Sequence, residues 1–224
     1  MKISIGSTWH QAPTGARVGV LIMNEVANPL SHPRLEAHKA ELERELRRRY
    51  ARKERADLRA EPRPAAYDHF YRQFKKTYHL QLQLESVCSG RPISSVATLV
   101  EAMIMAELED LLLTAGHDLD TVHPPIQIEV ADGTEAYTTM KGEMQTLKCG
   151  DLFIHDAEGV LSSLIYGPDR RSRIRPETKH VLFTTYAVPG IWAADLLAHL
   201  KNLRDHVLLI APEADVEYMG IVGD

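Results

Sequence analysis

The chain has 224 residues, of which 44% are hydrophobic and 25% are charged, and its formal net charge at pH 7 is −5. Such a length and composition are ordinary for a globular protein with one substantial core or two small ones. The acidic balance argues against strong, indiscriminate nucleic-acid binding, which draws on a basic field.

No apolar run approaches the roughly 20 residues that span a bilayer, and residues 1–10 lack the apolar core of a signal peptide. We therefore expect a cytoplasmic location and no membrane partner. Cys88 and Cys149 are too few for a disulfide framework and form no metal-type pair, so both are predicted to be buried free thiols.

The first half of the chain predicts mainly helices after one early strand. Residues 18–23 form a short apolar run that is typical of a buried strand. A helical arm is predicted next, with Ser31 as its cap and Pro33 in its first turn, and it should run to about Arg59. A second helix over residues 65–76 has an aromatic face, which its helical spacing assigns to the core rather than to base stacking.

The arm concentrates positive charge. From Arg34 to Arg59 there are ten basic and six acidic side chains, a net charge of +4, whereas the remaining chain has a net charge of −9. One interpretation is a nucleic-acid-binding face that contacts phosphates. The other, which the charge pattern alone favours, is a solvated helix with ion pairs four residues apart. The residues assigned to RNA binding under the first interpretation are Arg47, Arg48, Arg52 and Arg55.

Residues 78–89 fit two structures. Polar and apolar residues alternate strictly at its start, as in a strand, but Leu80, Leu84 and Val87 also fit one helix face. A long apolar helix is then predicted from a cap at Ser94 or Ser95 through Leu113, with Gly116 as its stop signal.

The second half predicts strands after His117. They are expected at residues 126–130, around Tyr137, Leu147 and Phe153, and at residues 160–166 and 181–185. A helix over 191–205 and an edge strand over 207–210 complete the pattern. Helices therefore come mainly early and strands mainly late, which predicts an α+β fold with a mixed or antiparallel sheet.

The common catalytic motifs are missing. The sequence has no Walker loop, no dinucleotide-binding glycine pattern, no His-Glu-x-x-His and no Gly-x-Ser-x-Gly. These absences argue against a typical nucleotide hydrolase, dehydrogenase, zincin or α/β-hydrolase.

Two polar clusters have alternative interpretations. His117, Asp118 and Asp120 are possible metal ligands, but their position in a turn favours a structural role, and no metal or cofactor is expected. His79 and Glu85, at either end of the stretch that includes Gln81 and Gln83, are a possible acid–base pair, although surface polarity explains them better.

A loop after the strand at 160–166 contains candidate anion ligands. Asp169, Arg170 and Arg171 follow a Gly-Pro turn, and two arginines there can bind phosphate or carboxylate. Lys141 and Arg175 could extend this site.

Residues 150–188, together with 91–101, resemble the B3/B4 module of the phenylalanyl-tRNA synthetase β chain. They resemble the freestanding B3/B4 proteins more closely. The resemblance covers residues 18–188. The segments that share its order and spacing are Pro92-Ile-Ser-Ser-Val96, Leu99-Val-Glu101, Asp118-Leu-Asp120, Gly150-Asp151, Asp156, Gly159-Val-Leu161 and Glu177-Thr-Lys179. It implies a helix at 78–89 and a single domain over 1–224, with 191–224 as an extension.

The synthetase module is an editing domain that hydrolyses tyrosine wrongly attached to tRNA. By the resemblance, its pocket positions correspond to Met103 and Ile104 on the long helix, Ala115 after it, Pro168 and Thr184. Every polar group that reads the tyrosine ester is changed at these positions. The resemblance thus implies a more apolar pocket, suited to an aliphatic or thioether side chain. The further candidates are Tyr166 for substrate binding and His117 and His79 for catalysis.

The leading hypothesis is a protein that binds aminoacyl-tRNA and hydrolyses a mischarged aminoacyl ester in trans. One alternative is a tRNA- or RNA-binding module without catalysis. Another is a small-molecule enzyme or amino-acid sensor that uses the pocket without RNA, which the sequence pI of about 6.1 favours. Fold-level analogy does not choose among them, and whether the protein is an enzyme stays open.

Overall fold

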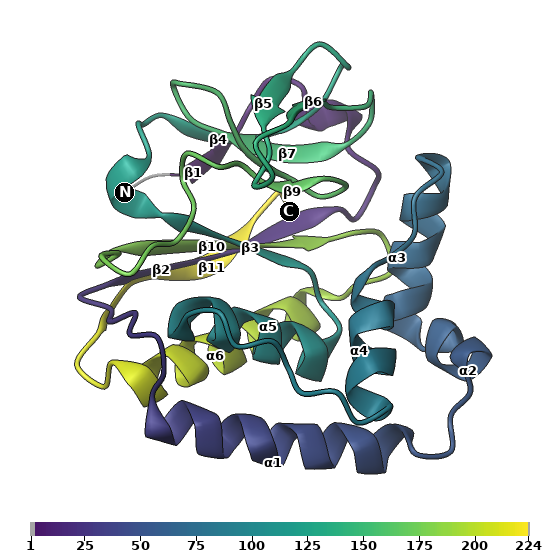
Figure 1. Ribbon diagram of the computed structural model, residues 1–224. Helices are drawn as coiled ribbons and strands as arrows, with labels where there is room; N and C mark the ends of the chain where they lie inside the picture. Colours follow the sequence, from purple (N-terminus) through teal and green to yellow (C-terminus); the bar gives the residue numbers. More distant parts are fainter. Residues whose placement is uncertain (1–2, 224) are drawn as a thin grey trace.

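A computed structural model describes residues 3–223, and its elements form stacked layers (Figure 1). The central layer is a four-stranded sheet, whose strands in spatial order are β11 (Asp215–Val222), β2 (Arg17–Asn24), β10 (Val181–Ala187) and β3 (Thr114–Asp118). All its pairings are antiparallel. The predicted buried strand at 18–23 is confirmed as the centre of β2.

A second sheet lies over one face of the central sheet. Its strands in spatial order are β1 (Ile3–Ile5), β4 (Ile126–Val130), β7 (Leu152–His155), β8 (Val160–Ser163) and β9 (Gly167–Pro168). Only β1 and β4 pair in parallel within this sheet. A small hairpin of β5 (Ala136–Thr138) and β6 (Met144–Thr146) lies above it (Figure 1).

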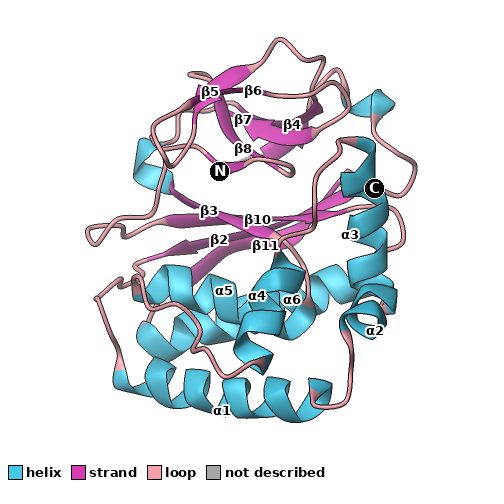
Figure 2. Ribbon diagram, turned by 45° about the vertical axis from the view of Figure 1, so that its right-hand side comes forward, coloured by secondary structure: helices cyan, strands magenta, loops and turns pink. Residues whose placement is uncertain are grey.

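Helices cover the opposite face of the central sheet. Figure 2 shows α5 and α6 against the sheet, α1 beneath them, α4 in front of α5 and α6, and α2 and α3 at the right-hand side. The helices are α1 (Pro33–Tyr50), α2 (Arg55–Ala60), α3 (Pro62–Gln73), α4 (Leu80–Cys88), α5 (Thr98–Asp110) and α6 (Ala193–Ile210). Two short 3-10 turns are η1 (Trp9–Gln11) and η2 (Leu119–Thr121). The predicted α+β class is confirmed, and so is a helix within residues 78–89.

One continuous apolar core joins the helices to both sheets, and a smaller apolar cluster lies under the β5–β6 hairpin. Strand β10 is buried along its whole length because it lies between the helical layer and the second sheet. The single-domain organisation stays a prediction. Within residues 3–223, no helix has both the length and the hydropathy needed to cross a bilayer.

The predicted arm is two helices rather than one. Helix α1 ends at Tyr50, and α2 starts after Glu54, whose backbone N–H donates to the Asp57 carboxylate at 2.9 Å. This local bond begins a new helix and so ends the continuous arm before Arg59. The residue at the N-cap of α1 is His32, so the predicted cap at Ser31 is wrong.

The long central helix is also shorter than predicted. It starts after Ala97 instead of Ser94 or Ser95, and it ends at Asp110 because Leu111 adopts a left-handed conformation with φ of 56°. The chain then turns into β3, which pairs with β10. Gly116 lies in this strand rather than at a helix end, where an added Cβ would lie 3.1 Å from the Phe183 ring.

The prediction for the C-terminal region is wrong in one element. Residues 207–210 belong to α6 rather than to an edge strand, since Val207 and Ile210 continue the buried helical face of Leu203. The edge strand is β11, which pairs with β2. Cys149 is exposed, so the prediction that both thiols are buried fails there, while Cys88 is half-buried.

Candidate functional site

A cavity of about 240 Å³ lies where the helical layer meets the edges of both sheets. Helices α4 and α5 form one side, and β3, β10 and the β8–β9 segment form the other. Its lining residues are His79, Gln83, Met103, Ile104, Glu107, Leu113, Thr114, Ala115, Ser163, Leu164, Gly167, Pro168 and Tyr186. Most of the wall is apolar, so a ligand would be held mainly by burial of its own apolar surface.

Glu107 is the buried charge-bearing group of this cavity. Only 6% of the residue is exposed, and burial raises the pKa of its carboxyl to about 8. Its Oε1 accepts a hydrogen bond of 2.7 Å from the backbone N–H of Thr114. This bond ties the end of α5 to the start of β3, so the same residue shapes the turn and faces the cavity.

Tyr186 connects the cavity to a buried polar network between the two sheets. Its hydroxyl lies 2.9 Å from Ser162 Oγ, which lies 3.2 Å from Nε2 of His117. On the other ring nitrogen, His117 Nδ1 lies 2.7 Å from Ser172 Oγ, and that hydroxyl donates to the buried carboxylate of Asp169. Burial lowers the pKa of His117 to about 3, so its ring is neutral near pH 7.

The structure brings several of the predicted pocket residues together. Met103, Ile104, Ala115 and Pro168 all line the cavity, and so does His79. His117 is fully buried behind the wall, and Asp169 is buried in the same polar network. Neither lies on the cavity wall.

Thr184 and Tyr166 are also absent from the wall. Thr184 is fully buried in β10, and the residue of that strand that reaches the cavity is Tyr186, two positions later on the same face. Tyr166 instead lies under the Lys76 ammonium group, which is 5.0 Å from its ring centroid.

Sequence reasoning missed Glu107, Ser163 and Tyr186. Helical spacing offers a signal for Glu107, because it follows Met103 by four residues and Ile104 by three, and such residues share a helix face. Strand alternation offers a similar signal for Tyr186, because it lies two residues after the pocket position Thr184 and residues two apart share a strand face. No local pattern marks Ser163.

The two arginines of the predicted anion-binding loop differ. Arg171 is held by the Asp156 carboxylate at 2.8 Å and by the Thr121 carbonyl, so its guanidinium is already paired. Arg170 is exposed, and its backbone N–H donates to the Thr138 carbonyl, which seats it against the β5–β6 hairpin. Arg175 pairs with Asp118 at 3.3 Å.

Of the four arginines assigned to RNA binding, two are paired within the protein and two are exposed. Arg47 pairs with Glu43 at 3.1 Å and donates to the Val87 carbonyl, and Arg55 pairs with Glu85 at 3.2 Å. Arg48 and Arg52 are exposed. Phosphate contacts from this segment would therefore depend mainly on Arg48 and Arg52, since the other two are engaged within the protein.

The residues of the possible metal cluster point to different partners. His117 contacts two serines, Asp118 pairs with Arg175, and Asp120 lies 2.7 Å from Nδ1 of His180. Across residues 3–223, no group of three His, Cys, Asp or Glu side chains is arranged to hold a metal ion. Asp118 and Asp120 therefore stabilise the turn after β3, and His117 belongs to the buried polar network.

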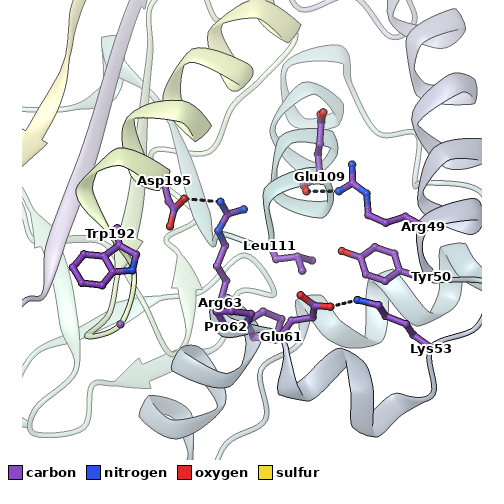
Figure 3. Close-up of a pocket in the computed structure, with 12 residues that line it drawn as sticks. Arg49, Tyr50, Lys53, Glu61, Pro62, Arg63, Glu109, Leu111, Trp192 and Asp195 are labelled. Atoms are coloured by element: carbon purple, nitrogen blue, oxygen red, sulfur yellow. Dashed lines mark hydrogen bonds and ion pairs between the residues drawn. The ribbon is translucent and has the colours of Figure 1, made fainter.

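A larger cavity of about 510 Å³ lies between the end of α1, the start of α3 and the start of α6. Figure 3 shows its charged side chains in pairs: Arg63 with Asp195, Lys53 with Glu61, and Arg49 with the backbone carbonyl of Glu109. The exposed Trp192 lies at its edge. Arg49 also pairs with the Glu45 carboxylate at 2.6 Å, so all three cations have carboxylate partners and the cavity offers no uncompensated charge to an anion.

The layered fold and the smaller cavity define an α+β protein with one small, mainly apolar pocket at the junction of its layers. Residues 64–201, more than half of the chain, match the family model of the B3/4 domain, and the chain belongs to that family.

Among solved structures, the chain is similar to an N-terminal fragment of the phenylalanyl-tRNA synthetase β-subunit from Pyrococcus horikoshii. The two share 18% sequence identity with a TM-score of 0.45, and the match covers 55% of this chain and 42% of the fragment. The chain thus spans less than half of that fragment. The search of curated proteins finds no match.

Proposed function

We propose that this protein binds aminoacyl-tRNA and hydrolyses a mischarged aminoacyl ester in trans, and that residues 1–224 form the single domain that does so. One observation carries the proposal. Four of the five positions at which an editing pocket is expected from the B3/B4 resemblance, Met103, Ile104, Ala115 and Pro168, come from three separate parts of the chain and line one cavity. Membership of the B3/4 family over residues 64–201 supports the proposal, since these positions lie within the matched region.

The cavity favours a small apolar acyl group. Its volume of about 240 Å³ is below the roughly 300–1,000 Å³ of drug-sized pockets, so it suits a ligand the size of an amino acid. Met103, Ile104 and Leu113 present aliphatic or thioether surface rather than a partner for a phenol hydroxyl. Such a pocket separates similar side chains by only about 1–3 kcal/mol per methylene, so we expect a group of aliphatic and thioether substrates.

Ester hydrolysis at this site would not need a protein nucleophile. A positioned water molecule and the terminal ribose hydroxyl of the tRNA can supply the reacting oxygens, while the protein contributes orientation and electrostatics. His79, at the N-cap of α4, and Gln83, within it, give the cavity a polar edge at which such a water could be held. His117, behind the wall, would act through Ser162 on the position of Tyr186.

A non-catalytic RNA-binding protein is the second candidate. The observation that favours it is that every matched polar editing position is apolar or otherwise changed in this chain. In that case tRNA would bind in a salt-dependent way without turnover.

A deacylation screen over a complete set of charged tRNAs tests the proposal. We expect hydrolysis above the spontaneous rate for one or more aliphatic or thioether aminoacyl-tRNAs and little for tyrosyl-tRNA. Salt-dependent tRNA binding with no hydrolysis of any substrate would instead support the binding module. A thermal shift with free amino acids but no tRNA binding would support an amino-acid sensor.

A further inference from the structure

Glu107 has an unusual environment for a carboxyl group. Tyr67, Tyr71 and Tyr78 lie close enough to interact electrostatically with it. Burial raises the pKa of all three phenols, and the negative charge of Glu107 adds to the effect in each. No cationic side chain among residues 3–223 forms an ion pair with its carboxylate. A buried carboxylate without a cationic partner is costly, so an ordinary core position would favour an uncharged residue here.

The bonds within the protein use only part of this side chain. Oε1 accepts from Thr114 N–H, and this bond would be made equally well by a glutamine. The backbone carbonyl of Glu107, not its side chain, accepts the N–H of Leu111 at the helix end. The structural role therefore explains an acceptor at this position but does not explain an ionisable one.

The carboxyl also faces the space where a ligand would lie. Glu107 is on the same helix face as Met103 and Ile104, one turn further along α5, and all three line the cavity. A ligand whose apolar group contacts Met103 and Ile104 would place its neighbouring atoms within one helical turn of Glu107, about 5 Å.

We propose that Glu107 is the ammonium-binding residue of this cavity and that it receives the protonated α-amino group of the aminoacyl ester. The inference rests on the proposed function for the class of ester, but the ammonium contact holds for any primary amine of amino-acid size. An ammonium group supplies the missing cationic partner, and a charge-assisted hydrogen bond in a low-dielectric site is stronger than a neutral one.

The protonation state of Glu107 gives the proposal a distinct signature. Because burial holds its pKa near 8, much of the carboxyl is protonated at pH 7 in the unliganded protein. A bound ammonium group favours the ionised form, so binding should release a proton from Glu107 into the buffer. Calorimetry in buffers of different ionisation enthalpy measures that release.

The test compares an ester with its α-hydroxy analogue, in which a hydroxyl of similar size replaces the ammonium group. Calorimetry measures binding of methionine methyl ester and of its α-hydroxy counterpart. For the wild type we expect about 10- to 100-fold weaker binding of the hydroxy analogue, the value of one hydrogen bond to a charged group. Glu107→Gln should abolish the difference and the proton release while the melting temperature stays near that of the wild type.

Glu109→Gln is the matched control. Glu109 lies on the same helix but bonds to Asn202 and His206, away from the cavity, so the preference for the ammonium group should persist. Equal binding of the two esters by the wild type, no binding of either, or an unchanged preference in Glu107→Gln would each overturn the inference.

A second assay separates this inference from the proposed function. Deacylation of the preferred aminoacyl-tRNA is compared with that of the corresponding α-hydroxyacyl-tRNA. If both are cleaved at one rate, the deacylase proposal stands and the ammonium site fails. If neither is cleaved while the methyl ester still binds through Glu107, the ammonium site stands and the deacylase proposal fails.

Discussion

Glu107 couples the stability of the fold to pH. Its folded pKa of about 8 is above the ordinary value of 4.5, so the folded state holds its proton more tightly than the unfolded chain. Its contribution to stability is therefore fully present below about pH 4.5 and is lost as pH rises through 8. Asp151 acts in the same direction, with a pKa raised by burial to about 7.

This linkage gives a prediction for Glu107→Gln. Between pH 7 and 8, urea unfolding of the wild type should show a free energy of unfolding that falls with pH, by at most about 1.4 kcal/mol per unit for one proton. The variant should lose the part of the slope that Glu107 contributes and keep the part from Asp151, whose pKa of about 7 leaves it half ionised at pH 7 and mostly ionised at pH 8. Identical slopes in the two proteins would mean that Glu107 is already ionised in the fold.

Arg171 and Arg170 should behave differently although they are neighbours. Arg171→Ala removes the partner of Asp156, whose side chain is fully buried, but leaves the backbone bonds from His123, Glu158 and Gly159. We expect a loss of about 1–3 kcal/mol in the free energy of unfolding. Arg170→Ala should change it by less than about 0.5 kcal/mol, as is usual for an exposed side chain. Chemical denaturation checks both, and equal effects would contradict the pairing.

At the scale of elements, the end of α1 and the turn after it are the proposed tRNA contact. Arg48 and Arg52 are exposed there, whereas Arg47 and Arg55 have carboxylate partners. Arg48→Glu with Arg52→Glu should weaken tRNA binding. It should also reduce the slope of the logarithm of the binding constant against the logarithm of salt concentration by the amount expected for about two phosphate contacts. Fluorescence anisotropy over a series of salt concentrations measures both quantities.

Arg34→Glu with Lys179→Glu is the matched control for charge. Both residues are exposed, and Arg34 lies about 20 Å from Arg48, since a helix rises about 1.5 Å per residue. The control should keep most of the affinity and the salt slope. Equal losses of affinity in the two double variants would indicate an unspecific effect of net charge. No loss in either would mean that α1 is a solvent-exposed helix that does not contact tRNA.

The elements that the sequence predicts well are those with a strong local pattern. Strand β2 and helices α3 and α5 follow from continuous or periodic apolar residues. Strand β3 does not, because Thr114-Ala-Gly-His-Asp118 has little strand propensity and owes its conformation to pairing with β10. Strand β11 has only a short alternation over residues 215–218, which a register shift interrupts, and its place in the sheet is set by its pairing with β2.

At the scale of the molecule, the cavity exists because three layers meet at one edge. β3 is the edge strand of the central sheet, β9 is the edge strand of the second sheet, and α5 closes the space beneath them. The resemblance predicted Met103, Ile104, Ala115 and Pro168 because those positions follow family motifs. It missed Glu107 and Tyr186, since their place on the wall depends on where α5 ends and how β10 packs.

Met103→Trp tests the central claim, that this cavity holds the acyl group of the substrate. The larger ring should fill much of the space, so deacylation of the preferred aminoacyl-tRNA should slow by more than about tenfold. Affinity for uncharged tRNA should stay within about twofold, because phosphate contacts dominate it. Met144→Trp, the same change at a 72% exposed position, should leave the rate unaltered. An unchanged rate in a folded Met103→Trp protein would contradict the claim.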